Sequence, residues 1–90
     1  MRLDTEALAD IVVRLKRAQG QIGGVIRMIE DGRDCADLIT QLAAVSRAVD
    51  RAGFKIIANG LQQCIQAEDA GSAEATLDRA QLEKLFLTLA

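Results

Sequence analysis

The chain has 90 residues, a formal net charge of −2 and 50% apolar residues, with only two aromatic side chains and no proline. A chain of this length forms one small domain, and none of its apolar runs approaches the roughly 20 residues that a membrane span needs. The first ten residues, MRLDTEALAD, include acidic side chains and lack the apolar core of an export signal. We therefore expect a cytoplasmic helical protein without membrane association, in which both cysteines stay reduced.

The first predicted helix covers residues 5–29. Its apolar residues recur at spacings of three, four and seven, which is one face of a helix: Leu8, Ile11, Val12, Leu15, Ile22, Val25, Ile26 and Ile29. Asp4 or Thr5 can cap its start, and Gly32 in the segment EDGRD is placed to end it.

The second predicted helix covers residues 34–66, with Asp34 as N-cap and Cys35 in the first turn. Its apolar stripe comprises Leu38, Leu42, Val45, Val49, Ala52 and Ile56. A third helix, residues 73–89, follows the capping residue Ser72. One such hairpin buries few side chains, so we expect an all-α fold in which a three-helix protomer pairs with a copy into an antiparallel four-helix bundle.

The two cysteines, Cys35 and Cys64, are 29 positions apart on the second helix. At about 100° per residue they share one face, but they lie about 43 Å apart along the axis, whereas a disulfide needs Cα atoms within about 7 Å. An antiparallel copy would bring Cys35 of one subunit to Cys64 of the other, once at each end. Because backbone N–H groups at a helix start favour a thiolate, Cys35 is the better nucleophile and Cys64 the better resolving thiol. The alternative is two inert, buried cysteines.

Basic side chains form stripes on both long helices. Nine of the eleven Lys and Arg residues fall in residues 1–55, and three polar residues follow helical spacing on each helix, with Lys16 beside the first set: Arg14, Arg17 and Gln21, then Arg47, Arg51 and Lys55. Each stripe is either a solvated face or a nucleic-acid surface, and no helix-turn-helix is evident. The chain has no histidine, no carboxylate pair and no cofactor motif, so we predict that it is not an enzyme. A helical interaction module without DNA binding remains an alternative.

The segment RLKRAQGQIGGVIRMIEDGRDCADLITQLAAVSRAVDRA resembles the CsoR/RcnR family of bacterial transcriptional repressors, and the match extends over about residues 12–66. It is carried by the following residues: Arg14–Arg17, Gly20, Gln21, Met28–Glu30, Cys35, Gln41, Ala43–Val45 and Cys64. The resemblance implies an antiparallel dimer, a disc-like dimer of dimers, and binding to operator DNA that an inducer at the inter-subunit thiols reverses. The family's DNA-contacting positions match Arg14 and Arg51, with Lys16, Arg17, Gln21 and Arg47 as neighbours.

The resemblance also bears on the inducer. Copper-sensing members use a Cys, His, Cys set in which the histidine lies four residues before the second cysteine, and that position here is Gly60. Nickel and cobalt sensors of the family need several histidines. A site with two cysteines and no histidine is similar to the persulfide-sensing, CstR-like branch. We therefore expect no metal, and a repressor that persulfides or polysulfides release through a Cys35–Cys64 di- or polysulfide between subunits. The alternative is a Cu(I)-responsive repressor in which the same two thiols bind the metal.

Overall fold

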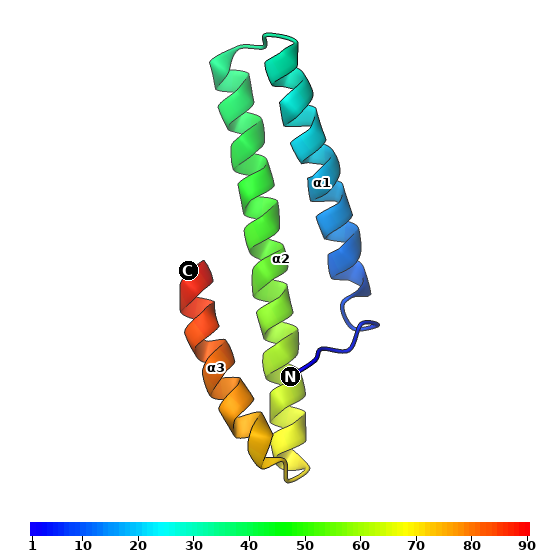
Figure 1. Ribbon diagram of the computed structural model, residues 1–90, viewed down its shortest axis with the longest axis vertical. Helices are drawn as coiled ribbons and strands as arrows, with labels where there is room; N and C mark the ends of the chain where they lie inside the picture. The colour runs from blue at the N-terminus through cyan, green and yellow to red at the C-terminus, as the bar shows by residue number, and fades with distance from the viewer.

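The computed structural model describes residues 1–90 as three helices without a strand, which confirms the all-α prediction: α1 (Ala9–Glu30), α2 (Cys35–Asp69) and α3 (Ala73–Leu89). Helices α1 and α2 form an antiparallel hairpin, and α3 folds back along the far end of α2 on its other side (Figure 1). Helix α2 contacts both of the others, whereas α1 and α3 do not contact each other. The longest helix is therefore the central element of the molecule, which is 57 Å long and 13 Å thick.

The turn between α1 and α2 is built from the residues that the sequence indicated. Gly32 has φ +71°, a left-handed conformation that favours glycine, and the Arg33 N–H donates to the Met28 carbonyl at 2.9 Å. These features end α1 in a Schellman motif. The Asp34 carboxylate then accepts a hydrogen bond from the Ala36 N–H at 3.0 Å, which confirms Asp34 as the N-cap of α2.

The second turn repeats this chemistry. Gly71 has φ +95°, and the Ser72 N–H donates to the Ala67 carbonyl at 2.9 Å. The Ser72 hydroxyl accepts from the Ala75 N–H, so Ser72 is the N-cap of α3 as predicted. This turn directs α3 back along α2 and covers that end of the long helix.

The chain departs from the sequence prediction at its first residues. Helix α1 begins at Ala9 rather than at residue 5, and its N-cap, Leu8, has no side-chain hydrogen bond. Asp4 does accept a bond from the Glu6 N–H, but within a turn that precedes the helix. The physical reason is a competing tertiary contact: the Gln63 side chain of α2 hydrogen-bonds to the backbone of residues 2 and 4. Helix α2 also continues to Asp69, beyond the predicted residue 66.

The core is a thin seam along α2. Eight residues are buried: Ile11, Ala18, Val45, Ala52, Ile57, Gly60, Cys64 and Ala75. Phe54 of α2 and Phe86 of α3 stack with ring centroids 5.4 Å apart, a tilted geometry that adds to the packing of these two helices. Since two of the predicted stripe residues, Leu42 and Val49, are exposed, one chain covers only part of the apolar face of α2.

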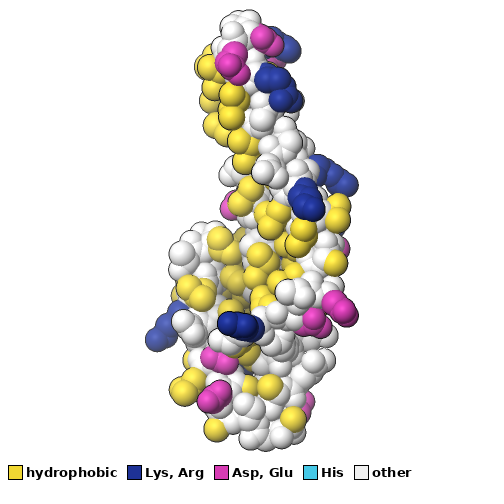
Figure 2. All heavy atoms as spheres, turned by 45° about the vertical axis from the view of Figure 1, so that its right-hand side comes forward, with side chains coloured by type: hydrophobic (Ala, Val, Ile, Leu, Met, Phe, Trp, Pro, Cys, Tyr) yellow, Lys and Arg dark blue, Asp and Glu magenta, His cyan; other side chains and the backbone are white.

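Large apolar side chains remain open on the hairpin. Ile29 of α1 is 62% exposed and Ile39 of α2 is 59% exposed, near the turn that joins the two helices. Figure 2 shows apolar side chains along this part of the surface with basic side chains close by. None of the three helices combines the length and hydropathy that crossing a lipid bilayer requires.

The Asp34 cap provides the first prediction. Asp34→Ala removes the only side chain that satisfies an N–H group at the start of α2, and it should lower the free energy of unfolding by about 1 kcal/mol. Urea unfolding followed by circular dichroism at one fixed protein concentration measures this loss.

Asp31→Ala is the matched control, because Asp31 is exposed and makes no side-chain hydrogen bond. It should shift the urea midpoint by much less than Asp34→Ala does. Equal midpoints for the two variants would contradict the role of Asp34.

Candidate thiol site and basic surface

Cys35 is the first residue of α2 and is exposed. It lies at the hairpin turn, where only α1 runs beside α2 and α3 does not reach (Figure 1). Arg33, which the sequence places next to this thiol, forms an ion pair with Asp37 at 3.6 Å. Both partners are more than half exposed, so the pair adds little stability. Cys35 is thus open to a partner molecule or a reagent.

Cys64, five residues from the end of α2, has the opposite environment. Only 3% of it is exposed, because α3 and the first residues of the chain cover this end of the helix. Its Sγ lies 3.3 Å from the Met1 Sδ, close enough for a weak S–H···S hydrogen bond. The two thiols therefore share a helix but differ in access to solvent.

The electrostatic surroundings keep the Cys64 thiol protonated. Burial raises its pKa, and the negative charges of Asp78 on α3 and Glu68 on α2 raise it further. The N-terminal ammonium and Arg79 act in the other direction but less strongly. Arg79 itself is held by Glu68 at 2.8 Å and by Glu83 at 3.0 Å. Cys64 is consequently a poor nucleophile at neutral pH, although a cation near it would offset the surrounding negative charge.

The two thiols do not meet within one chain. Helix α2 runs without interruption from Cys35 past Cys64, so the separation of about 43 Å expected from the helical rise holds. Within one chain, no group of three or more Cys, His, Asp or Glu side chains is arranged so that it could hold a metal ion. A site that uses both thiols must therefore combine two copies.

Gly60 is buried where α3 and the start of the chain converge on α2. A Cβ atom at this position would lie 3.0 Å from the Leu82 Cδ1 and 3.3 Å from the Met1 Cε. Glycine thus permits the close approach of both segments, and a larger side chain here would displace them. The structure gives this position a packing role and leaves no room for an additional ligand.

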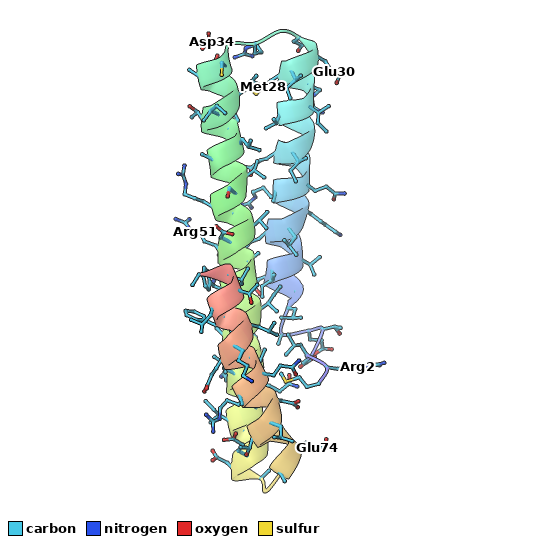
Figure 3. The ribbon with its side chains drawn as sticks, turned by 60° about the vertical axis from the view of Figure 1, so that its left-hand side comes forward. Arg2, Met28, Glu30, Asp34, Arg51 and Glu74 are labelled. Carbon is cyan, nitrogen blue, oxygen red and sulfur yellow. The ribbon has the colours of Figure 1, made fainter.

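The six residues predicted to contact DNA are all exposed, and none forms an ion pair: Arg14, Lys16, Arg17, Gln21, Arg47 and Arg51. Arg14 lies 16 residues before the end of α1 at Glu30, and Arg51 lies 16 residues after the start of α2 at Cys35. In an antiparallel hairpin these positions are at the same level, about 24 Å from the turn. Figure 3 shows Arg51 on the side of α2 away from α1. Both helices of the hairpin therefore carry a cation at the same distance from the turn that joins them.

Sequence reasoning missed Met1 and Gln63 as part of the Cys64 environment. Gln63 donates its Nε2–H to the Arg2 carbonyl at 2.7 Å, and its Oε1 accepts from the Asp4 N–H at 3.3 Å. These contacts join residues about 60 positions apart, so the local pattern of apolar residues does not predict them. The one available signal was chemical, since methionine is a soft sulfur ligand like cysteine.

Comparison with known proteins places this fold among helical transcriptional regulators. The solved structure of the nickel-responsive transcriptional regulator InrS superposes with a TM-score of 0.78, is 30% identical, and covers 92% of each chain. Residues 7–89 match the family described as metal-sensitive transcriptional repressor. The chain belongs to this family, as the resemblance in its sequence predicted.

Two relatives are named for copper. The copper-sensing transcriptional repressor CsoR of Mycobacterium ulcerans (strain Agy99) is 38% identical over 66 residues, which are 72% of this chain and 56% of that protein. The copper-sensing transcriptional repressor RicR of Mycobacterium tuberculosis (strain ATCC 25618 / H37Rv) is 34% identical over 70 residues, which are 74% of this chain and 73% of RicR. These relatives are repressors rather than enzymes, in agreement with the prediction that the chain is not an enzyme.

The charges around Cys64 provide a second prediction. In a Cys35→Ala background, where Cys64 is the only thiol, Asp78→Asn removes a charge that raises the Cys64 pKa. The pKa should fall, and the rate of alkylation by iodoacetamide at pH 8 should rise by about two-fold or more, because the thiolate is the reactive form.

The matched control is Asp69→Asn, which makes the same substitution at an exposed aspartate that does not act on Cys64. Its alkylation rate should equal that of the parent across the pH series. Equal acceleration by both substitutions would show that the charge of Asp78 has no specific effect.

Proposed function

We propose that this chain is a repressor that binds operator DNA as an assembly of antiparallel copies, and that binding of Cu(I) between Cys64 of one subunit and Cys35 of the partner subunit releases the DNA. The observation that carries the proposal is the position of the two thiols at opposite ends of one uninterrupted helix. An antiparallel copy of α2 would bring Cys35 of one subunit to Cys64 of the other. Two-fold symmetry would then repeat the same pair at the opposite end.

The exposed apolar face supports a second copy as the partner. Only eight of 90 residues are buried in the single chain, and a domain of this size gains little stability from so small a core. Both helices of the hairpin expose large apolar side chains: Ile22, Ile26 and Ile29 on α1, and Ile39 and Leu42 on α2. A second hairpin with the same apolar residues would cover them and build the four-helix bundle.

Three observations favour copper as the inducer. The relatives reported above are named for copper or nickel, which favours the Cu(I) alternative over the reactive-sulfur prediction. Thiolates are soft ligands that suit Cu(I). Burial and the nearby carboxylates keep Cys64 protonated, which disfavours its attack on a persulfide but not its binding of a cation, because a bound metal deprotonates its thiol ligands.

The basic side chains support DNA as the partner. Five of the six exposed residues of α1 and α2 are cations, and none of the five has a carboxylate partner in the chain, so their charges are available for phosphates. A symmetric assembly would repeat this surface and give contacts to successive stretches of a duplex. A dimer of dimers is the assembly that the family resemblance implies.

Reactive sulfur is a second candidate, favoured by the absence of histidine and by the open position of Cys35. The Cys35 thiolate would attack the outer sulfur of a persulfide and expel the inner sulfur as a thiol. Cys64 of the partner subunit would then attack the Cys35 persulfide and release hydrogen sulfide with formation of a disulfide. This route needs a reactive Cys64 thiolate, which the raised pKa opposes.

Arg51 tests the DNA surface. Arg51→Ala should weaken binding to a duplex that the protein itself selects from a random library, by roughly ten-fold or more, and should lower the dependence of affinity on salt concentration, because phosphate contacts release counterions. Fluorescence anisotropy at several salt concentrations measures both quantities.

Lys84→Ala is the control, because Lys84 is an exposed cation of α3 outside the proposed surface. Its affinity and salt dependence should match those of the unmodified protein. Normal DNA binding by Arg51→Ala, with the oligomer intact by light scattering, would remove Arg51 from the interface.

The inducer is tested on the preformed DNA complex under anaerobic conditions. One equivalent of Cu(I) per pair of thiols should release the DNA, and Cys35→Ser or Cys64→Ser should abolish the release while DNA affinity without copper stays within about two-fold, since neither thiol lies on the basic surface. Release by glutathione persulfide, together with linked dimers in intact-mass spectra and no response to Cu(I), would favour reactive sulfur instead.

A further inference from the structure

The first residues of the chain are fixed across α2 directly above Cys64. Both polar atoms of the Gln63 amide are used, one on the Arg2 carbonyl and one on the Asp4 N–H. Figure 3 shows Arg2 pointing away from the helices. Because Gln63 directly precedes Cys64 on α2, these two hydrogen bonds hold Met1 beside the buried thiol.

Met1 places a second sulfur atom at Cys64. Its Sδ lies 3.3 Å from the Cys64 Sγ, and the thioether is the only hydrogen-bond partner that the thiol has within the chain. The methyl group of Met1 passes over Gly60, where a Cβ would lie 3.3 Å from the Met1 Cε. Met1 is 52% exposed whereas Cys64 is buried, so the pair of sulfur atoms lies at the boundary between the core and solvent.

A small cavity opens beside the two sulfur atoms. Its volume is about 90 Å³, and Met1, Cys64, Glu74 and Asp78 are among the residues that line it. Two carboxylates and two sulfur atoms thus surround one recess. The carboxylates attract a cation, and the charges of Asp78 and Glu68 act on Cys64 more strongly than the opposing charges of the N-terminal ammonium and Arg79.

We propose that the Met1 thioether is a Cu(I) ligand, which with Cys64 and Cys35 of the partner subunit completes a site of three sulfur donors. The proposal rests on the proposed function, and it supplies the donor that two thiols alone lack. Thiolate and thioether sulfur are the soft ligands that select Cu(I). Each thiol would lose its proton to water on binding, the thioether would donate a lone pair, and copper would remain Cu(I) without transfer of an electron.

The chain contains only two methionines, Met1 and Met28, which allows a direct spectroscopic test. In a Met28→Leu variant grown with selenomethionine, selenium marks Met1 alone. The X-ray absorption spectrum of the copper-loaded protein at the selenium edge should show a copper neighbour. The same labelled protein with Cys64→Ser should lose that neighbour, because Met1 would then share the metal only with Cys35 of the partner subunit, and we expect these two donors not to hold copper at this end of α2.

Affinity gives an independent measurement. Replacing Met1 by norleucine in the Met28→Leu background removes the sulfur atom but keeps the length of the side chain. The dissociation constant for Cu(I), measured by competition with a chromogenic chelator, should rise by roughly ten-fold or more, since even residues that only support metal ligands have effects of this size. The affinity for DNA without copper should not change.

The outcomes separate this proposal from the function on which it rests. A protein that binds Cu(I) through Cys35 and Cys64, but shows no copper neighbour of selenium and no loss of affinity with norleucine, overturns the role of Met1 and leaves the function intact. A protein that does not bind Cu(I) overturns both.

Discussion

The rigidity of α2 is the constraint on which the other features depend. One uninterrupted helix of 35 residues carries both thiols and most of the core, and its rise of about 1.5 Å per residue fixes the thiols about 43 Å apart. No rearrangement of a loop brings them together, because no loop separates them. Any chemistry that needs both thiols therefore requires two subunits, and in the proposed function the response to Cu(I) would depend on the contact between copies.

The two ends of α2 differ in their exposure to solvent. Near the turn, Cys35 and the apolar side chains around it lie open, as a surface that a copy would cover. At the other end, α3 and the first residues of the chain enclose Cys64. In an antiparallel assembly the open end of one subunit meets the enclosed end of the next, so a ligand bound there would act on the packing of both helices at once. This is a physical basis for coupling the thiols to the basic surface at the middle of the hairpin.

Local chemistry explains which parts of the fold the sequence predicted. Asp34, Ser72 and Gly32 are capping and turn residues whose effect reaches only a few positions, and the structure shows each in the predicted role. The family resemblance, also carried by short motifs, was confirmed by the match over residues 7–89. The predicted start of α1 was wrong because Gln63 hydrogen-bonds to the backbone of residues 2 and 4, about 60 positions away in the sequence. The spacing of apolar residues along one helix cannot predict a contact with a residue so distant in the sequence.

The same limit applied to the ligand set. Taken alone, the sequence offered two cysteines and no histidine, and Gly60 read as a missing ligand, which favoured chemistry confined to thiols. The structure gives that glycine a different meaning, because its lack of a side chain leaves space for the methyl group of Met1 and so allows the thioether to reach Cys64. A position that cannot bind a metal can still permit a donor from elsewhere in the chain. The absence of a ligand from a sequence motif therefore does not exclude a metal when the fold brings another soft atom to the same place.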